Sequence, residues 1–227
     1  MTFMGQRFAI ASDTREWLLT KFARGKANYW FTFVADFSAA MFFLVWEIVS
    51  RGIRPAWAGV AFFAGIMAWG LTEYIFHRWV YHQPDGIFGE GHNIHHTEAQ
   101  ELIAMPWFMT TLTMFALWAF CARILNIPYF SSILSGWLAG FVWYSIVHHS
   151  HHHWILRNGW IRRLKAYHRV HHQFPGYNFG VTIRYWDVVF GTVYRKPGQA
   201  VQGLSGIRQT AKVAHPETAQ EAVLADA

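Results

Sequence analysis

Residues 129–153 read YFSSILSGWLAGFVWYSIVHHSHHH, an apolar run that ends in a tract of histidines. Its apolar part, 129–147, is close to the ~20 residues that a helix needs to cross ~30 Å of hydrocarbon. Three similar runs precede it, at 29–49, 56–76 and 104–125. The short connections 50–55 and 126–128 indicate tight turns between paired helices. We therefore predict an all-α integral membrane protein with four transmembrane helices.

The composition supports a membrane protein and excludes other classes. Charged residues make up only 14% of the chain, while 53% is hydrophobic. Soluble domains carry about 25% charged residues. The single cysteine, Cys121, excludes an internal disulfide framework. The net charge of +6 is explained by basic residues that flank the membrane spans. No nucleic-acid recognition module is visible, and we expect no nucleic-acid partner.

The flanking charges predict the orientation and the organisation of the chain. Lysine and arginine concentrate before the first run and after the fourth, and are sparse in the two short turns. The positive-inside rule then places both termini and the central loop in the cytoplasm, where they form a histidine-rich helical cap. We expect a cytoplasmic N-terminal segment at 1–28, a membrane domain at 29–195 and a mobile polar tail at 196–227.

Fourteen histidines are the most unusual feature, and ten of them form four clusters on that one predicted side. Residues i, i+3 and i+4 share one face of a helix, so each H-x2-H-H triplet and the H-x3-H pair direct their rings the same way. The H-x4-H pair requires the helix to end between its two members, with residues 83–86 as the stop. The clusters are His77 with His82, His92 with His95 and His96, His148 with His152, and His168 with His171 and His172.

The clusters predict a metal site. Neutral imidazole is the commonest protein ligand for transition metals and suits iron, zinc and copper. Ten ligands exceed the needs of one ion, so we expect two metals with about five nitrogens each. The register of the third cluster stays open, because His149 and His153 show the same spacing as the preferred His148 and His152. Ligand histidines usually donate their second N–H to an orienting group; the candidates, with Asp187 preferred, are Asp187, Asn178, Glu73 and Glu90.

A histidine-based metal transporter or metal sensor is the alternative from another class. Transport favours ligands within the spans along a path. The histidines here lie at and beyond the span ends, which favours a closed site.

The histidine clusters and their surroundings resemble the fatty acid hydroxylase and sterol desaturase superfamily. The resemblance covers about residues 70–195 and rests on the stretches EYIFHRWVYH (73–82), HNIHH (92–96), LKAYHRVHH (164–172), NFG (178–180) and WDVVFGT (186–192). The chain is most similar to the fatty acid 2-hydroxylases, in which a tyrosine precedes the H-x3-H pair by four positions, as Tyr144 precedes His148. Ser145 stands where the family pattern often has aspartate.

The resemblance implies a membrane-bound di-iron oxygenase that hydroxylates a lipid C–H bond with O2 and external electrons. The implied substrate is a fatty acid or a sphingolipid acyl chain, and a sterol or carotenoid desaturase or hydroxylase of the same superfamily is the alternative. The implied cofactors are two iron ions, although zinc can replace iron in isolated protein because it binds nitrogen sites more tightly. The implied electron donor is a separate protein of the cytochrome b5 or ferredoxin type.

Overall fold

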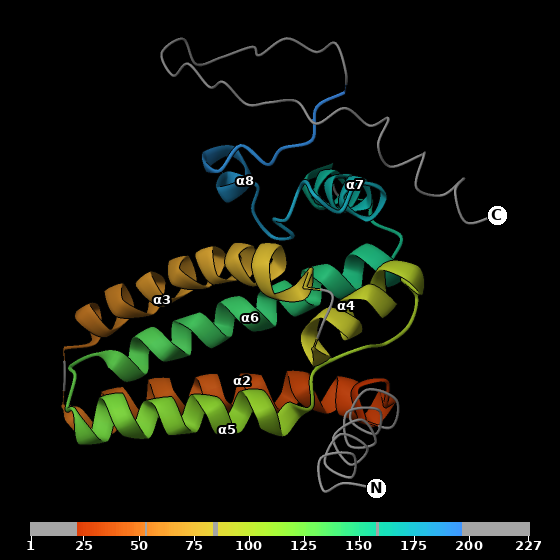
Figure 1. The fold of residues 1–227 in the computed structure, drawn as a ribbon. Helices are drawn as coiled ribbons and strands as arrows, with labels where there is room; N and C mark the ends of the chain where they lie inside the picture. Colours follow the sequence, from red (N-terminus) through yellow and green to blue (C-terminus); the bar gives the residue numbers. More distant parts are fainter. Residues whose placement is uncertain (1–21, 53, 84–85, 158, 197–227) are drawn as a thin grey trace, which may run out of the picture. The chain divides into compact units, whose positions relative to one another are not determined.

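The computed structural model describes residues 22–52, 54–83, 86–157 and 159–196, and the regular elements within these ranges are all helical. Four helical segments are long and apolar enough to cross a membrane, which confirms the four predicted spans (Figure 1). They are α2 (Lys26–Arg51), α3 (Pro55–Ile75) with the π-helix η2 (Phe76–Tyr81), α5 (Trp107–Trp118) with the π-helix η3 (Ala119–Ile124), and α6 (Phe130–His153). The expected tail at 196–227, apart from its first residue, and most of the expected N-terminal segment lie outside the described residues.

Three shorter helices complete the described part of the chain. They are α4 (Ile87–Thr97), α7 (Gly159–Gln173) and α8 (Tyr185–Val189). These helices gather near the ends of α3–η2 and α6 that carry the histidines (Figure 1). The helix α6 continues six residues beyond the predicted end of its span, so His148 and His152 remain on one helix face.

The two turns at the opposite end are fixed by backbone geometry and by charge. The first turn uses Gly52 at a left-handed φ of 58° and Pro55 at the start of α3. At the second turn, the carboxylate of Glu47 accepts the backbone N–H groups of Tyr129 and Ser131 at 3.1 and 3.0 Å. This carboxylate offsets the unpaired donors and the positive dipole at the start of α6.

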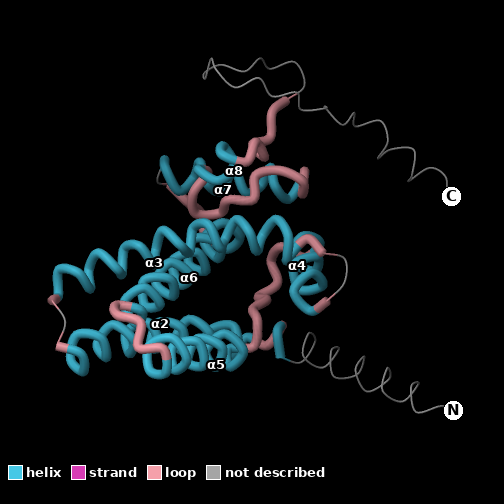
Figure 2. Tube along the Cα trace, turned by 60° about the vertical axis from the view of Figure 1, so that its left-hand side comes forward, coloured by secondary structure: helices cyan, strands magenta, loops and turns pink. Residues whose placement is uncertain are grey.

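The helix α6 lies between α3 and α2 in the bundle (Figure 2). Glycines allow α3 and α6 to approach closely, as is common for helices in membranes. A Cβ atom on Gly65 would overlap the carbonyl oxygen of Ile133, and one on Gly136 would overlap that of Phe62. The two helices are thereby held in a fixed register, which positions their histidine-bearing ends.

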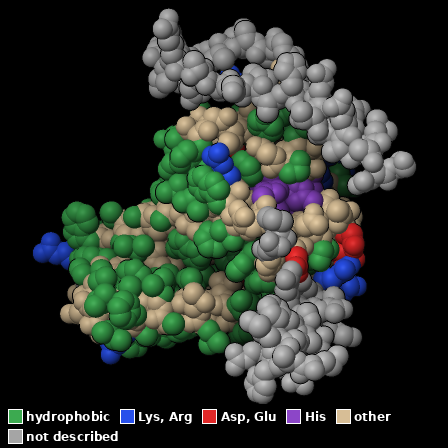
Figure 3. Space-filling model, viewed as in Figure 1, with side chains coloured by type: hydrophobic (Ala, Val, Ile, Leu, Met, Phe, Trp, Pro, Cys, Tyr) green, Lys and Arg blue, Asp and Glu red, His purple; other side chains and the backbone are tan. Residues whose placement is uncertain are grey.

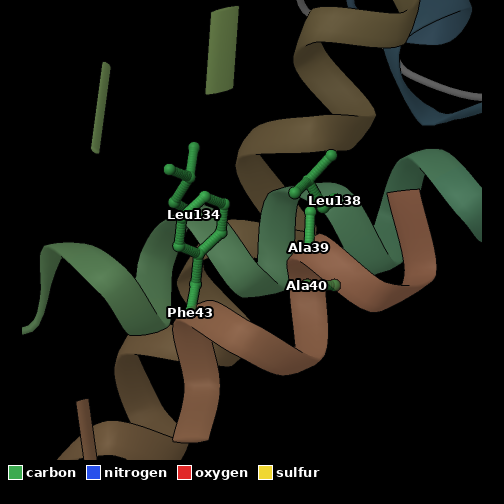
Figure 4. Packing of buried hydrophobic residues seen from close by; sticks show 5 residues of the cluster. All are labelled: Ala39, Ala40, Phe43, Leu134 and Leu138. Carbon is green, nitrogen blue, oxygen red and sulfur yellow. The ribbon is translucent and has the colours of Figure 1, made fainter. Parts of the chain in front are cut away.

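The contact between α2 and α6 forms the apolar core of the bundle. Ala39 and Ala40 of α2 give Leu138 and Leu134 of α6 room to pack beside Phe43 (Figure 4). Large side chains on the outer surfaces are exposed, for example Phe63 at 67%. Such an outward apolar surface is expected where lipid surrounds the protein.

Candidate metal centre

Nine histidines of the described residues converge in two neighbouring groups. In the first group, the ligand nitrogens of five side chains all lie within 4.8 Å of one another; these are His77, His82, His92, His96 and His171. In the second group, four side chains satisfy the same limit, namely His95, His152, His168 and His172. The rings of His96 and His172 stack at 4.4 Å between centroids, so the two groups are in contact.

Each H-x2-H-H triplet contributes to both groups. On α4, the i and i+4 residues His92 and His96 join the first group, whereas the intervening His95 joins the second. On α7 the assignment is exchanged, because His168 and His172 join the second group and His171 joins the first. The two helices therefore hold the groups side by side in a reciprocal arrangement.

The Nε2 atoms face one another at distances that suit a shared cation. His77 and His92 are 3.1 Å apart, and His171 lies 3.2 Å from His82 and 3.1 Å from His96. Two nitrogens bound at ~2.1 Å and at right angles to one ion would be about 3.0 Å apart. The spacing therefore fits the edges of a coordination polyhedron.

The tautomers of two histidines support the same conclusion. The Nδ1 of His77 lies 2.5 Å from the carbonyl oxygen of Phe179, and that of His171 lies 2.7 Å from the carbonyl oxygen of Tyr177. An Nδ1 that donates to a carbonyl leaves a lone pair on Nε2. Lone pairs that converge in this way repel one another, and a bound cation would offset the repulsion.

A π-helix aligns the first histidine pair. The helix ends between His77 and His82 as expected, because η2 stops at Tyr81 and His82 caps it, but its last turn is a π-helix and not an α-helix. In a π-helix the backbone hydrogen bonds join residues five apart, and such turns occur frequently at functional sites. The extra residue brings the two rings onto one side, where they stack at 5.5 Å. An ideal α-helix would separate them by about 140°.

The two registers left open for the third histidine cluster lie in different environments. The Nε2 of His152 lies 3.0 Å from that of His168, within the second group. The ring of His148 stands beside this group, at 4.5 Å from His95 and 4.8 Å from His168. By contrast, the Nδ1 of His149 lies 2.9 Å from the hydroxyl of Tyr29.

The candidate orienting residues act on the loop behind the histidines. Asp187 accepts the backbone N–H groups of Phe179 and Gly180. Glu73 accepts those of Val181 and Thr182 together with the Thr182 hydroxyl.

The other two candidate orienting residues are Asn178 and Glu90. Asn178 donates to the carbonyl of Tyr167 and accepts from the backbone of Tyr194. Glu90 lies in the first turn of α4, and its backbone N–H bonds the Gly86 carbonyl. The Nδ1 atoms of His77 and His171 are bonded to backbone carbonyls. Composition and spacing do not reveal such partners.

Burial keeps the histidines beyond the spans in the neutral form that binds metals. Desolvation, together with the neighbouring imidazoles, lowers the pKa of His95 to about 2 and that of His96 to about 3. Desolvation also lowers the pKa of His171 to about 3, although the bond to Tyr177 opposes this shift. The pKa values of His82, His92, His168 and His172 are lowered by the same cause. These rings are therefore ready to bind a metal ion at neutral pH.

A mainly apolar cavity of about 140 Å³ borders both histidine groups. It is enclosed by the start of α2, by α4, by α6 and by the segment 103–105. Phe33 and Phe141 line it on the bundle side, whereas His92 and His95 line it on the side of the two histidine groups. The cavity thus links the membrane-spanning part to the histidines.

Comparison with known proteins identifies the family. The chain matches the family model described as fatty acid hydroxylase over residues 62–192, which is more than half of its length. It belongs to the fatty acid hydroxylase family. The matched range contains each of the ten predicted ligand histidines and the π-helix η2, and the resemblance noted from the sequence is thereby confirmed.

Relatives within the fatty acid hydroxylase family act on acyl chains, as their names state. Dihydroceramide fatty acyl 2-hydroxylase FAH2 of Arabidopsis thaliana is 29% identical over 153 residues, which cover 63% of this chain and 65% of the relative. Fatty acid 2-hydroxylase of Homo sapiens is 25% identical over 186 residues, which cover 76% of this chain and 46% of the relative. The aligned regions thus span less than two thirds of these relatives.

A solved structure shares the fold of this hydroxylase family member. It is described as full-length scs7p with only the hydroxylase domain visible, and it superposes with a TM-score of 0.63 at 26% identity. The match covers 77% of this chain and 69% of that one.

Proposed function

We propose that this chain is a membrane-bound lipid hydroxylase that holds two iron ions. The observation that carries the proposal is the cavity, which joins an apolar wall in the membrane-spanning part to both histidine groups. Known relatives named as acyl 2-hydroxylases favour a fatty acid or sphingolipid acyl chain over a sterol or carotenoid. When bound, the iron ions would supply the activation of O2 that inserts oxygen into a C–H bond.

In this proposal each histidine group holds one ion. The first group supplies five nitrogens, and the second supplies four. We assign His148 as the additional ligand of the second group because its ring adjoins His95 and His168. We assign the H-x3-H pair to His148 and His152, since His149 is engaged by Tyr29. The carbonyls of Phe179 and Tyr177 fix the tautomers of His77 and His171.

The cavity would orient the substrate. Pockets that enclose a whole drug-sized ligand measure about 300–1,000 Å³, so a cavity of about 140 Å³ admits only part of a long lipid. Phe33 and Phe141 would hold a short stretch of the acyl chain beside the histidines and would exclude water, while the rest of the chain stays in the bilayer.

Orientation and electron supply complete the proposal. The basic residues Arg162, Arg163 and Arg169 follow the fourth span and lie exposed on α7. Such residues favour the cytoplasmic side, so we place the histidine end of the bundle there. The oxidation needs electrons from outside the chain, and we propose a separate donor protein of the cytochrome b5 or ferredoxin type.

Expression in cells followed by mass spectrometry of the extracted lipids tests this proposal. The wild-type chain should add one oxygen to acyl chains, and His171→Ala should abolish this product because it removes a nitrogen from the first group. His149→Ala is the matched control, since His149 belongs to neither group. A loss of two hydrogens instead would indicate a desaturase. Iron-loaded, folded protein that produces neither change alongside a functional donor would refute the proposal.

A further inference from the structure

The short helix α8 and the residues before it lie against the last turns of α3, within its apolar run. A Cβ atom on Gly70 would lie 2.9 Å from Cδ1 of Ile183 and 3.7 Å from Nε1 of Trp186. Gly70 precedes Phe76, the end of the apolar run, by about 9 Å at 1.5 Å per residue. Phe190, at the end of α8, stacks on Tyr74 of α3 at 4.9 Å and 14°. The segment from Ile183 to Phe190 therefore runs beside the last turns of a membrane-spanning helix.

The outer face of α8 is apolar and exposed. Tyr185 is 62% exposed, Val188 59% and Val189 48%. The neighbouring Ile75, Phe76 and Trp79 are exposed as well, so the apolar surface of α3 continues onto α8. Figure 3 shows hydrophobic side chains both on the bundle and above it, with polar side chains and backbone between them. Exposed apolar patches of this kind mark contacts with lipid or with another protein.

Two arginines stand at the border of this patch. The guanidinium of Arg78 lies 4.8 Å from the ring centroid of Trp79 and donates to the hydroxyl of Tyr74. That of Arg184 lies 4.6 Å from the ring centroid of Tyr167, on α7. Tryptophan and tyrosine are enriched at the headgroup level of a membrane, and basic residues flank the ends of its spans. The charges thus separate the apolar face of α8 from the cap.

We propose that α8 is seated in the bilayer, with Tyr185, Val188 and Val189 in contact with the acyl chains of the leaflet beside α3. Lipid is the occupant that the contacts favour, because the patch is continuous with the lipid-facing side of α3 and lies level with Gly70. This position of α8 also affects the histidines. Asp187 of α8 holds the backbone of Phe179, whose carbonyl bonds His77, so a membrane-seated helix braces the first group.

The test measures where α8 lies and does not depend on the reaction. The full chain, carrying Cys121→Ala, would be reconstituted into phosphatidylcholine–phosphatidylglycerol vesicles with a nitroxide label on Val188→Cys. Electron paramagnetic resonance then compares the access of O2, which concentrates in lipid, with that of a water-soluble nickel chelate. Val60→Cys, on the exposed face of α3, is the control in lipid. Arg163→Cys, on the exposed face of α7, is the control in water.

We expect the label at position 188 to behave like that at 60, with access to O2 and loss of access to the chelate. Access to the chelate equal to that at 163 would overturn the proposal, because α8 would then face water. Exclusion of both reagents would overturn it as well, since a protein surface would then cover the patch. Tyr185→Cys provides a second label site on the same face if the label at 188 disturbs folding.

Discussion

The substitution Asp187→Asn should weaken metal binding by the first histidine group while the bundle stays folded. Asp187 is fully buried and accepts three hydrogen bonds, from the N–H groups of Phe179 and Gly180 at 2.9 and 2.8 Å and from the hydroxyl of Thr192 at 2.7 Å. Asparagine keeps one acceptor oxygen but turns an NH2 group toward one of these donors. The loop that carries the Phe179 carbonyl therefore loses a support, and His77 loses its fixed orientation.

The magnitude follows from the bonds that change. A hydrogen bond to a charged group contributes about 1.5–3 kcal/mol, and a buried donor without a partner costs about 1–3 kcal/mol. Changes behind metal ligands usually lower metal affinity by roughly 10–100-fold. This range corresponds to about 1.4–2.8 kcal/mol, which agrees with the loss of one such bond. We therefore expect a 10–100-fold weaker first site.

Iron titration of the purified protein with a competing chelator measures this effect. Wild-type protein should bind two ions, whereas Asp187→Asn should retain one ion with wild-type affinity and bind the other more weakly. Gly59→Ala is a suitable control, because a Cβ atom at Gly59 meets no atom within 4 Å. Two wild-type affinities in the Asp187→Asn protein would refute the link from Asp187 through Phe179 to His77.

Three further outcomes are expected. Acidification should weaken the fold and release metal as the pH falls below about 6.5, the pKa of an unperturbed histidine; the folded-state pKa values of His95 and His96 are lower, so the unfolded chain binds more protons there. Metal content and thermal unfolding across pH 7 to 4 check this, and a flat profile would contradict it. Gly136→Ala should lower stability by about 1–3 kcal/mol through its overlap with Phe62, unlike Gly59→Ala; thermal unfolding in detergent measures the difference. A cysteine at Arg163, in the Cys121→Ala background, should react with an impermeant reagent only from the cytoplasmic side, and reaction from the outer side would reverse the orientation.

The sequence predicts the bundle well because its signal is strong. Four apolar runs of about span length leave few alternatives, and the structure contains helices at each of them. The division of the histidines into two groups is harder to predict. Spacing shows that His92, His95 and His96 share a face, but only the packing of α4 against η2 and the ring contacts with the histidines of α7 divide them between two groups.

Backbone geometry is the part that the sequence hides. No residue type indicates the π-helix at Phe76–Tyr81, and the spacing of His77 and His82 predicts only that the helix ends between them. Similarly, the acidic residue Asp187 attracts attention, whereas the carbonyls of Tyr177 and Phe179 carry no signal of their own. The carboxylates act through the backbone of one loop, and only its fold reveals that connection.

The π-helix at Phe76–Tyr81 affects how the sequence of such a protein can vary in evolution. A membrane span and a set of metal ligands impose different demands on one continuous helix, because each requires its own face. One added residue turns the part of the helix that follows it by about 100° relative to the span, so the histidines face a direction that the span alone would not give them. Residues on the lipid-facing side of α3 can thus be substituted to suit a different bilayer while His77 and His82 keep their direction. The π-helix thus joins a lipid-facing segment to a histidine-bearing segment, and substitutions in the two segments are selected for different properties.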